Sequence, residues 1–301
     1  MKKISGCYPA LVTPIIASEP NIDGKINFPE LEKLIKFVED CGVEGIAVAG
    51  CTGHSASLTV EEQLGLLDFA MEKASPKTRI IFGDGSNCTR EAIDFAKKAE
   101  DHGAKTHLSI SPYQNKPNPE GMFLHYSKIA SAIGGELIVY NVPGRTGKNI
   151  EAETTLRLAK EHSNIIGIKE ASGNIAQIKK IIDATEGSEF SVLSGDDALT
   201  LEIMRLGGTG VISTSANLIA KEMSEMVRHC LAGEFENAEK IDARLQPVYK
   251  AMFFDTNPMP MHYALKSIGI DAGIPRLPLC EIDSLTKEKI NSVLDNFRLS
   301  R

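Results

Sequence analysis

A lysine at the end of an apolar run is the residue best suited to chemistry in this sequence. Lys169 follows Ile165-Ile166-Gly167-Ile168, a run that predicts a buried β-strand. An ammonium at such a position is partly desolvated, which lowers its pKa, and the neutral amine can attack a ketone to form an iminium. The alternative is a lysine that extends out of the fold or pairs with Glu170 or Asp196. Position alone supports the two interpretations equally.

Three other features lie where they can assist such an amine. Tyr140 ends the preceding predicted strand, and a phenol can donate and accept protons there. The small-residue turn at residues 50–55 offers backbone N–H groups that can hold a carboxylate. Arg145 suits bidentate carboxylate binding. The alternatives are a buried tyrosine, an ordinary loop and a solvated arginine, but Tyr140 and Lys169 at adjacent strand ends favour a functional role.

Short apolar runs alternate with longer amphipathic segments over most of the chain. Several runs are apolar throughout, which is typical of parallel strands covered on both faces. The expected strands span residues 8–13, 45–50, 79–83, 106–111, 137–141, 165–169, 191–194 and 210–213. Between them, Leu31, Leu34 and Ile35 share one helical face, and Thr59 with Glu62 forms a capping-box pattern.

These strand–helix alternations imply parallel strands joined by helices, in a closed barrel or an open doubly wound sheet. No G-x-G-x-x-G follows the first strand and no P-loop is present, and the strand spacing suits a barrel of about 250 residues. We therefore predict an α/β fold, a (β/α)₈ TIM barrel at residues 1–225. Residues 226–301 are expected to form a C-terminal helical extension packed on the barrel. Active sites of such barrels lie at the C-terminal ends of the strands.

Composition narrows the classes of partner. The 301 residues carry a formal net charge of -7 without a basic stripe, so nucleic acid is not an expected partner. The six cysteines form no CxxC, and no apolar run approaches membrane-spanning length. The histidines are scattered, and no His/Cys/Asp cluster has metal-ligand spacing. We expect a cytoplasmic protein without membrane contact, metal or cofactor.

Longer tracts of the sequence resemble the dihydrodipicolinate synthase / N-acetylneuraminate lyase family. These tracts are residues 50–55 (Gly-x-Thr-Gly-x-Ser), 140–147, 167–174, 193–197, 210–213 and 257–260. Their joint occurrence over nearly the whole chain is highly specific. The tract at 140–147, with its arginine, is more similar to the synthase branch than to the sialic-acid lyase branch.

The resemblance implies that Lys169 forms a Schiff base with pyruvate and that Tyr140 relays protons. In the synthase branch the second substrate is L-aspartate 4-semialdehyde, and the product is an early intermediate of lysine biosynthesis. The implied substrate-binding positions are Thr52, Gly195, the backbone near Ile212 and, for the carboxylate of the second substrate, Arg145.

The resemblance also implies an assembly and a regulatory site. Members of this family are usually homotetramers built as dimers of dimers. Asn87, Glu91 and Tyr113 match positions that bind inhibitory lysine in regulated members.

Two residues depart from the synthase pattern. Cys51 replaces the first threonine of a Thr-Thr pair, and Gln114 replaces the second tyrosine of a Tyr-Tyr pair. In the family these two hydroxyls and the strand-five tyrosine form a proton relay. A thiol is a poorer hydrogen-bond partner than a hydroxyl, and an amide does not titrate near neutrality.

Three functions follow, in this order. The first is a synthase that condenses pyruvate with aspartate semialdehyde. The second is a sibling class I aldolase or lyase that uses the same iminium on another 2-keto acid or sugar acid. The third is a ligand-binding barrel without turnover. Cys51 and Gln114 add weight to the second and third, whereas Arg145 and its loop favour the first.

Overall fold

The computed structural model describes residues 3–19 and 21–299, which divide into two compact units. The first unit holds the described residues up to Gly6 together with Ile80–Ile212. The second unit holds Cys7–Arg79 and the described residues from Ser213 onward. Each unit combines parallel strands with helices.

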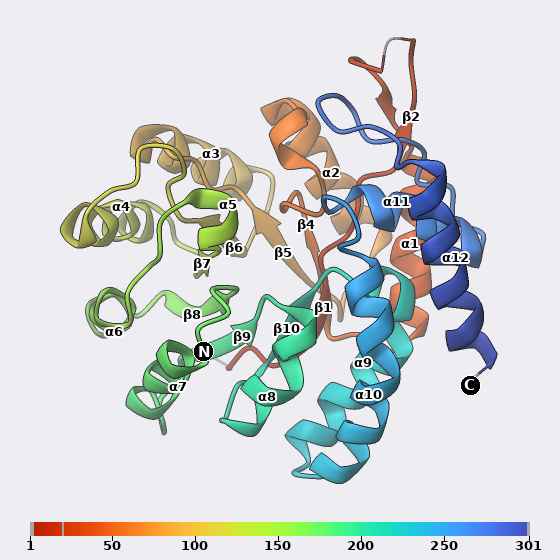
Figure 1. The fold of residues 1–301 in the computed structure, drawn as a ribbon. Helices are drawn as coiled ribbons and strands as arrows, with labels where there is room; N and C mark the ends of the chain where they lie inside the picture. The colour runs from red at the N-terminus through yellow and green to blue at the C-terminus, as the bar shows by residue number, and fades with distance from the viewer. Residues whose placement is uncertain (1–2, 20, 300–301) are drawn as a thin grey trace. The chain divides into compact units, whose positions relative to one another are not determined.

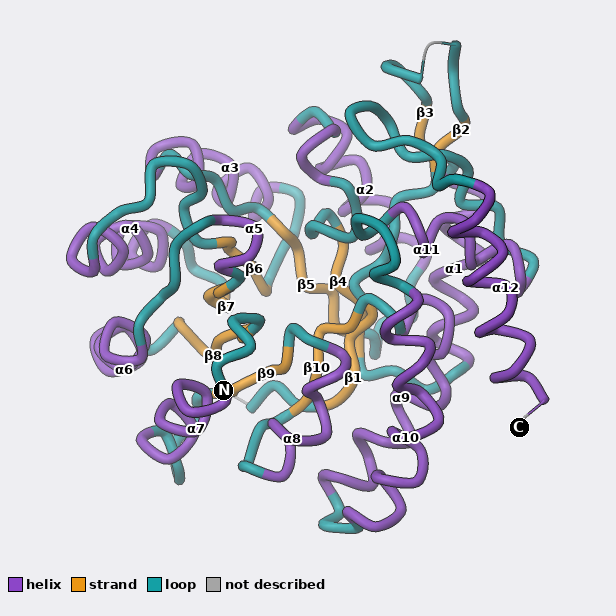
Figure 2. The backbone as a smooth tube through the Cα atoms, viewed as in Figure 1, coloured by secondary structure: helices purple, strands orange, loops and turns teal. Residues whose placement is uncertain are grey.

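The first unit contains a row of parallel strands with helices between them (Figures 1 and 2). The row has the order β10 (Gly210–Ser213), β9 (Ser191–Ser194), β8 (Ile165–Glu170), β7 (Glu136–Asn141), β6 (Thr106–Ile110) and β5 (Arg79–Gly83). Every pairing in it is parallel. The intervening helices are α3 (Thr89–Asp101), α4 (Pro119–Ala132), α5 (Pro143–Thr146), α6 (Ala152–Glu161), α7 (Ile175–Ala184), a 3₁₀ turn η2 (Asp197–Leu199) and α8 (Thr200–Arg205).

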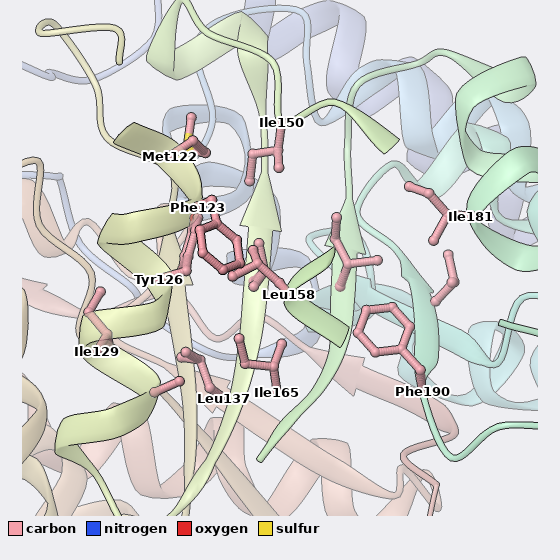
Figure 3. Packing of buried hydrophobic residues seen from close by; sticks show 14 of the residues in the cluster. Met122, Phe123, Tyr126, Ile129, Leu137, Ile150, Leu158, Ile165, Ile181 and Phe190 are labelled. Carbon is pink, nitrogen blue, oxygen red and sulfur yellow. The ribbon is translucent and has the colours of Figure 1, made fainter. Parts of the chain in front are cut away.

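The apolar core of the first unit lies between its strands and the helices that cover them. Figure 3 shows Phe123 and Tyr126 on the side of α4 that faces the strands, and Leu137 and Ile165, near the beginnings of β7 and β8, belong to the same cluster. All four side chains are buried. Burying apolar area of this kind contributes about 25 cal/mol per Å² removed from water. The core therefore fixes β7 and β8 side by side, and the C-terminal ends of these strands carry the residues of interest.

The second unit supplies two more parallel strands and most of the remaining helices. In it β1 (Gly6–Pro9) lies beside β4 (Gly45–Val48), as the parallel bridge between Ala10 and Ala47 shows. A hairpin is formed by β2 (Ile15–Ile16) and β3 (Lys25–Ile26). The helices are α1 (Phe28–Asp40), η1 (Ser55–Ser57), α2 (Val60–Lys73), α9 (Ala216–Leu231), α10 (Phe235–Ala251), α11 (Met259–Ala264), η3 (Leu265–Ile268) and α12 (Ser284–Leu299).

Parallel strands that alternate with helices, followed by C-terminal helices, make this a (β/α)₈ barrel with a helical extension. The predicted fold class is confirmed. The capping box of Thr59 and Glu62 is also present at the start of α2. The predicted domain boundary after residue 225 stays a prediction, and α9 runs continuously across it.

The first strand differs from its prediction. It was expected at residues 8–13, but β1 ends at Pro9, and the Ala10 and Leu11 N–H groups continue the backbone pairing by donating to the Ser213 and Ala47 carbonyls. Beyond the Ala10 bridge, side chains take over the backbone groups: the Val12 N–H donates to Asn217 Oδ1 at 3.1 Å. The β2–β3 hairpin was not predicted, because a two-residue strand carries too little alternation to be seen. Among the described residues, no helix is both long and apolar enough to cross a membrane.

His125 gives the fold a testable pH dependence. It lies in α4 with 4% of its surface exposed, and its Nδ1 is 2.9 Å from Thr89 Oγ1. Burial lowers its pKa from 6.5 to about 4. Between these two pH values the unfolded chain binds more protons at this residue than the folded chain, so protonation favours unfolding. The stabilisation is present above pH 6.5 and is lost as the pH falls towards 4.

We expect the substitution His125→Gln to remove this titration. The free energy of unfolding of the unmodified protein, measured relative to the variant by urea titration, should fall on acidification from pH 6.5 to about 4. The decrease should be at most about 3.5 kcal/mol, since the pKa is lowered by about 2.5 units and one pKa unit corresponds to about 1.4 kcal/mol. A difference between the two proteins that stayed constant over this range would show that His125 is not held neutral by burial.

Candidate active site

Lys169 and Tyr140 lie opposite each other on neighbouring strands. The register of β7 and β8 pairs Tyr140 with Lys169 directly. Both side chains are 7% exposed, and Lys169 Nζ lies 4.3 Å from the centre of the Tyr140 ring. Such a contact is a cation–π interaction when the amine is protonated. The geometry places an amine and a phenol together in a shielded position at the C-terminal ends of two strands.

Gly195 makes room for the Lys169 side chain. It follows β9, and its N–H donates to the Glu170 carbonyl at 2.8 Å. A Cβ at this position would lie 3.0 Å from both Cγ and Cε of Lys169 and 2.9 Å from Ala171 Cβ. Any larger residue would therefore displace the lysine chain. The predicted binding position Gly195 thus shapes the lysine site sterically.

Glu170 is buried beside Lys169 in sequence and holds a network of donors. Its Oε1 and Oε2 accept hydrogen bonds from Asn141 Nδ2 at 3.0 and 3.1 Å. Oε1 also accepts from the Ser172 N–H at 2.8 Å, and Oε2 accepts from Gln177 Nε2 at 3.1 Å. Burial raises the pKa of this carboxyl, although the hydrogen bonds counteract part of that effect. Adjacent residues of a strand point to opposite faces, so this network supports Tyr140 and Lys169 from behind.

The loop that carries Arg145 is tied to the same network. Arg145 is exposed on the short helix α5, which ends at Gly147 in the left-handed conformation (φ 72°). Asn141 Oδ1 accepts from the Ile150 N–H at 3.0 Å, and Asn141 Nδ2 donates to Asn149 Oδ1 at 2.8 Å. One side chain from the end of β7, where the loop begins, thus fixes the far end of the loop. Ile212, the remaining predicted substrate-binding position in the first unit, is buried in β10.

The turn after β4 belongs to the second unit. Thr52 is buried, and its Oγ1 lies 3.0 Å from Thr214 Oγ1 and accepts a hydrogen bond from Asn257 Nδ2 at 3.0 Å. Cys51 is half-buried. The backbone N–H groups of this turn were expected to be available to a carboxylate. In the structure the His54 and Ser55 N–H groups instead donate to carbonyls of the turn itself, and the turn continues into the 3₁₀ turn η1. That prediction is corrected for these two groups, because the turn closes on itself.

His54 of this turn is neutral near pH 7. Burial is the larger cause that lowers its pKa to about 4, and the nearby Arg276 guanidinium is the second. Its Nδ1 lies 2.8 Å from Ser57 Oγ. Arg276 in turn donates to both carboxylate oxygens of Glu62, at 2.8 and 2.5 Å, and holds the pKa of that carboxyl low. Arg276 also donates to the Ser57 carbonyl at 2.9 Å, so this arginine links the 3₁₀ turn η1 to Glu62 of α2.

Three positions of the implied lysine site lie close together in the first unit. Asn87 Nδ2 donates to the Tyr113 carbonyl at 3.2 Å, and Glu91 accepts from Ser86 Oγ at 3.0 Å. Gln114, which follows Tyr113, has a positive φ of 67°. Both Tyr113 and Gln114 are exposed. Asn87 thus contacts Tyr113 directly. Glu91 contacts Ser86, the residue that precedes Asn87 in the chain.

Several polar residues around these sites were given no role from the sequence, and Glu170 was considered only as an ion-pair partner of Lys169. Asn141, Glu170 and Gln177 form the network behind the lysine, and Thr214 and Asn257 contact Thr52. Asn257 falls within a tract that carried the family resemblance, which was a signal for its importance but not for its role. Within the described ranges 3–19 and 21–299, no three His, Cys, Asp or Glu side chains are grouped so that they could hold a metal ion.

Fold and site together define the class of this protein. A (β/α)₈ barrel with a buried lysine at a strand end beside a tyrosine has the arrangement of a lyase of the class I, Schiff-base type. The sequence narrows the class further. The chain matches the Dihydrodipicolinate synthetase family over residues 3–297, and it belongs to that family.

Relatives and solved structures agree over almost the full length of the chain. A 4-hydroxy-tetrahydrodipicolinate synthase of Methanocaldococcus jannaschii is 44% identical over 294 residues, which cover 98% of this chain and 99% of the relative. The chloride-inhibited dihydrodipicolinate synthase of Acinetobacter baumannii, crystallised with pyruvate, is 37% identical with a TM-score of 0.93 and coverages of 98% and 99%. The enzyme of Cyanidioschyzon merolae, crystallised with lysine, is 36% identical with a TM-score of 0.94 and coverages of 99% and 100%.

Proposed function

We propose that this protein condenses pyruvate with L-aspartate 4-semialdehyde to give 4-hydroxy-tetrahydrodipicolinate, an early step of lysine and diaminopimelate biosynthesis. The observation that carries the proposal is the Lys169–Tyr140 pair, a buried amine 4.3 Å from the centre of a phenol ring. The names of the relatives and the pyruvate in one solved structure support it.

In the proposed reaction, the Lys169 amine attacks the ketone carbon of pyruvate and water leaves, which forms an iminium. Loss of a proton from the pyruvate methyl group gives an enamine, whose carbon attacks the aldehyde of the second substrate. The amino group of that substrate then displaces Lys169 and closes the ring. Tyr140 is placed to carry protons in these steps, since its ring lies beside the amine.

Four positions complete the proposed substrate site. We assign pyruvate binding to Thr52, Gly195 and the backbone near Ile212. Arg145 is assigned the carboxylate of the semialdehyde, because a guanidinium binds a carboxylate through two parallel hydrogen bonds. Its exposed place on α5 suits a group that meets an incoming substrate.

The second candidate is a sibling aldolase, and the third is a ligand-binding barrel. Cys51 and Gln114, in place of a threonine and a tyrosine of the family relay, are the observations that favour them. Borohydride reduction in the presence of pyruvate, followed by peptide mapping, should locate a pyruvyl group on Lys169. An assay with aspartate semialdehyde should then show condensation.

Each outcome of that experiment selects one function. No adduct at Lys169 overturns every Schiff-base mechanism proposed here. An adduct with turnover of a different aldehyde supports the sibling aldolase. An adduct without turnover of any aldehyde in a broad panel supports the ligand-binding barrel.

We expect the two relay positions to limit the rate of condensation. The double substitution Cys51→Thr with Gln114→Tyr restores two hydroxyls at these positions. We expect kcat to rise by about tenfold, less than the about 10²-fold that a complete general acid–base contribution supplies at the least, because Tyr140 is already present. The matched control is Cys88→Ser, which alters a half-buried thiol at the start of α3. An unchanged kcat in the double variant would show that this chain moves protons by another route.

Assembly and regulation are further parts of the proposal. We propose a homotetramer built as a dimer of dimers, with no nucleic-acid or membrane partner, in the cytoplasm. We also propose that Asn87, Glu91 and Tyr113 form a lysine site, which the hydrogen bond between Asn87 and the Tyr113 carbonyl supports. Sedimentation analysis tests the assembly, and calorimetry with lysine tests the site.

A further inference from the structure

Asn257 approaches Thr52 from a part of the chain remote in sequence. It precedes Pro258 at the start of α11, 205 residues after Thr52, and its side chain is buried. Its Nδ2 donates to Thr52 Oγ1 at 3.0 Å. An amide nitrogen has donors and no lone pair to accept with, so this bond fills one lone pair of the threonine oxygen.

Thr214 approaches the same oxygen. It follows β10, and the two hydroxyl oxygens are 3.0 Å apart, so one of them donates to the other. A hydroxyl has one hydrogen and two lone pairs. If Thr214 donates, the second lone pair of Thr52 is filled and the Thr52 hydrogen is left to point at a third group. A bond made by that hydrogen to a carboxylate is charge-assisted and stronger than a bond between two hydroxyls.

We propose that Asn257 and Thr214 are positioning residues that make Thr52 an obligate hydrogen-bond donor for the carboxylate of the keto acid. Asn257 and Thr214 together occupy both lone pairs of Thr52 Oγ1, so its O–H is directed to the anion. The inference rests on the proposed function, because it assumes that a keto acid is bound. It adds Asn257 and Thr214 to the site and makes each of them a hydrogen-bond donor to Thr52.

Substitutions that reverse or remove each donor test the proposal. Asn257→Asp keeps the shape of the side chain but replaces the donor by an acceptor, which captures the Thr52 hydrogen and adds a negative charge. Thr214→Val removes the hydroxyl, whereas Thr214→Ser keeps it. We expect Asn257→Asp and Thr214→Val to raise the KM for pyruvate by at least about tenfold, the effect of one hydrogen bond to a charged group. Thr214→Ser should stay within about twofold of the unmodified protein.

Two further measurements separate this role from a general effect on the fold. The pyruvate concentration that gives half-maximal borohydride trapping should rise in parallel with the KM for pyruvate, while the KM for the aldehyde stays within about twofold. Asn27→Asp is the charge control. Asn27 caps α1 by accepting from the Glu30 N–H, which an aspartate also does, so trapping should be unchanged.

The outcomes distinguish the two proposals. If the unmodified protein forms no adduct, the proposed function fails. If it forms the adduct and Thr214→Val behaves like Thr214→Ser, the inference about Thr52 is overturned even though the function stands. Because the Thr214 pair is judged on its own, a poorly folded Asn257→Asp variant does not prevent the decision.

Discussion

Lys169→Met gives a folded protein that traps no pyruvyl adduct after borohydride reduction. Its kcat should fall by at least about 10⁴-fold, the scale of loss when a covalent nucleophile is removed. Methionine has almost the length of the lysine chain and no amine. The methionine chain is no longer than the lysine chain that lies against Gly195 in the structure, so it introduces no new clash there. The loss should therefore be chemical, with the barrel intact by circular dichroism and thermal unfolding.

A second substitution separates the nucleophile from the charge. In Lys169→Arg a cation remains at the end of β8, but a guanidinium stays protonated and cannot add to a ketone. We expect this variant to trap no adduct either. Lys179→Met is the matched control, because Lys179 is an exposed lysine of α7 that pairs with Asp183. It should trap pyruvate normally. A pyruvyl group found on another lysine of Lys169→Met would identify a different nucleophile.

The strands that carry Lys169 and Tyr140 were predictable because their signal is local. The run from Ile165 to Ile168 is apolar at every position, and the structure buries all of it in β8. Parallel strands place their C-terminal ends along one edge, so the meeting of Tyr140 with Lys169 followed from two adjacent runs and one rule of topology. Gly195 was assigned to substrate binding through resemblance, and that role stays a prediction. What the structure shows is that a side chain at this position would press on the Lys169 chain.

The polar contacts around the site were not predictable from local pattern. Thr52 meets Thr214 and Asn257 across 162 and 205 residues, and no periodicity in the sequence encodes such pairs. Glu170 was considered as an ion-pair partner for Lys169. In the structure its two oxygens accept hydrogen bonds from Asn141, Ser172 and Gln177. Which donors surround a buried carboxylate depends on the register of neighbouring strands and the course of loops, and both are set by the tertiary fold.

We expect the substitution Glu170→Gln to lower the free energy of unfolding by about 2–4 kcal/mol, because it turns one acceptor oxygen of a buried carboxylate into a donor. The new amide group would face either Gln177 Nε2 or the Ser172 N–H with a donor against a donor. Asn141 cannot relieve the conflict by turning its amide over. Its Oδ1 already accepts from the Ile150 N–H, and its Nδ2 donates to Asn149.

Gln177 cannot turn its amide over either. The mismatched hydrogen bonds at position 170 should therefore displace the loop that carries Arg145. Gln177 Nε2 also donates to the Ile150 carbonyl at 3.2 Å, and its Oε1 accepts from Asn149 Nδ2 at 2.8 Å. Asn149 and Ile150 close the loop that carries Arg145. We therefore expect Glu170→Gln to retain borohydride trapping on Lys169 while the KM for the aldehyde rises by about tenfold, the cost of about one lost or misplaced hydrogen bond to a charged group.

The exposed residue Glu153 provides the matched control for this prediction. It pairs with Lys180 on the surface, and surface ion pairs contribute at most about 1 kcal/mol, so Glu153→Gln should change neither stability nor KM by a comparable amount. Urea unfolding and steady-state kinetics on both variants decide the matter. If Glu170→Gln unfolds at the same urea concentration as the unmodified protein, the carboxylate does not hold the network together. If it is destabilised but keeps its KM for the aldehyde, the network supports the barrel wall and does not position the Arg145 loop.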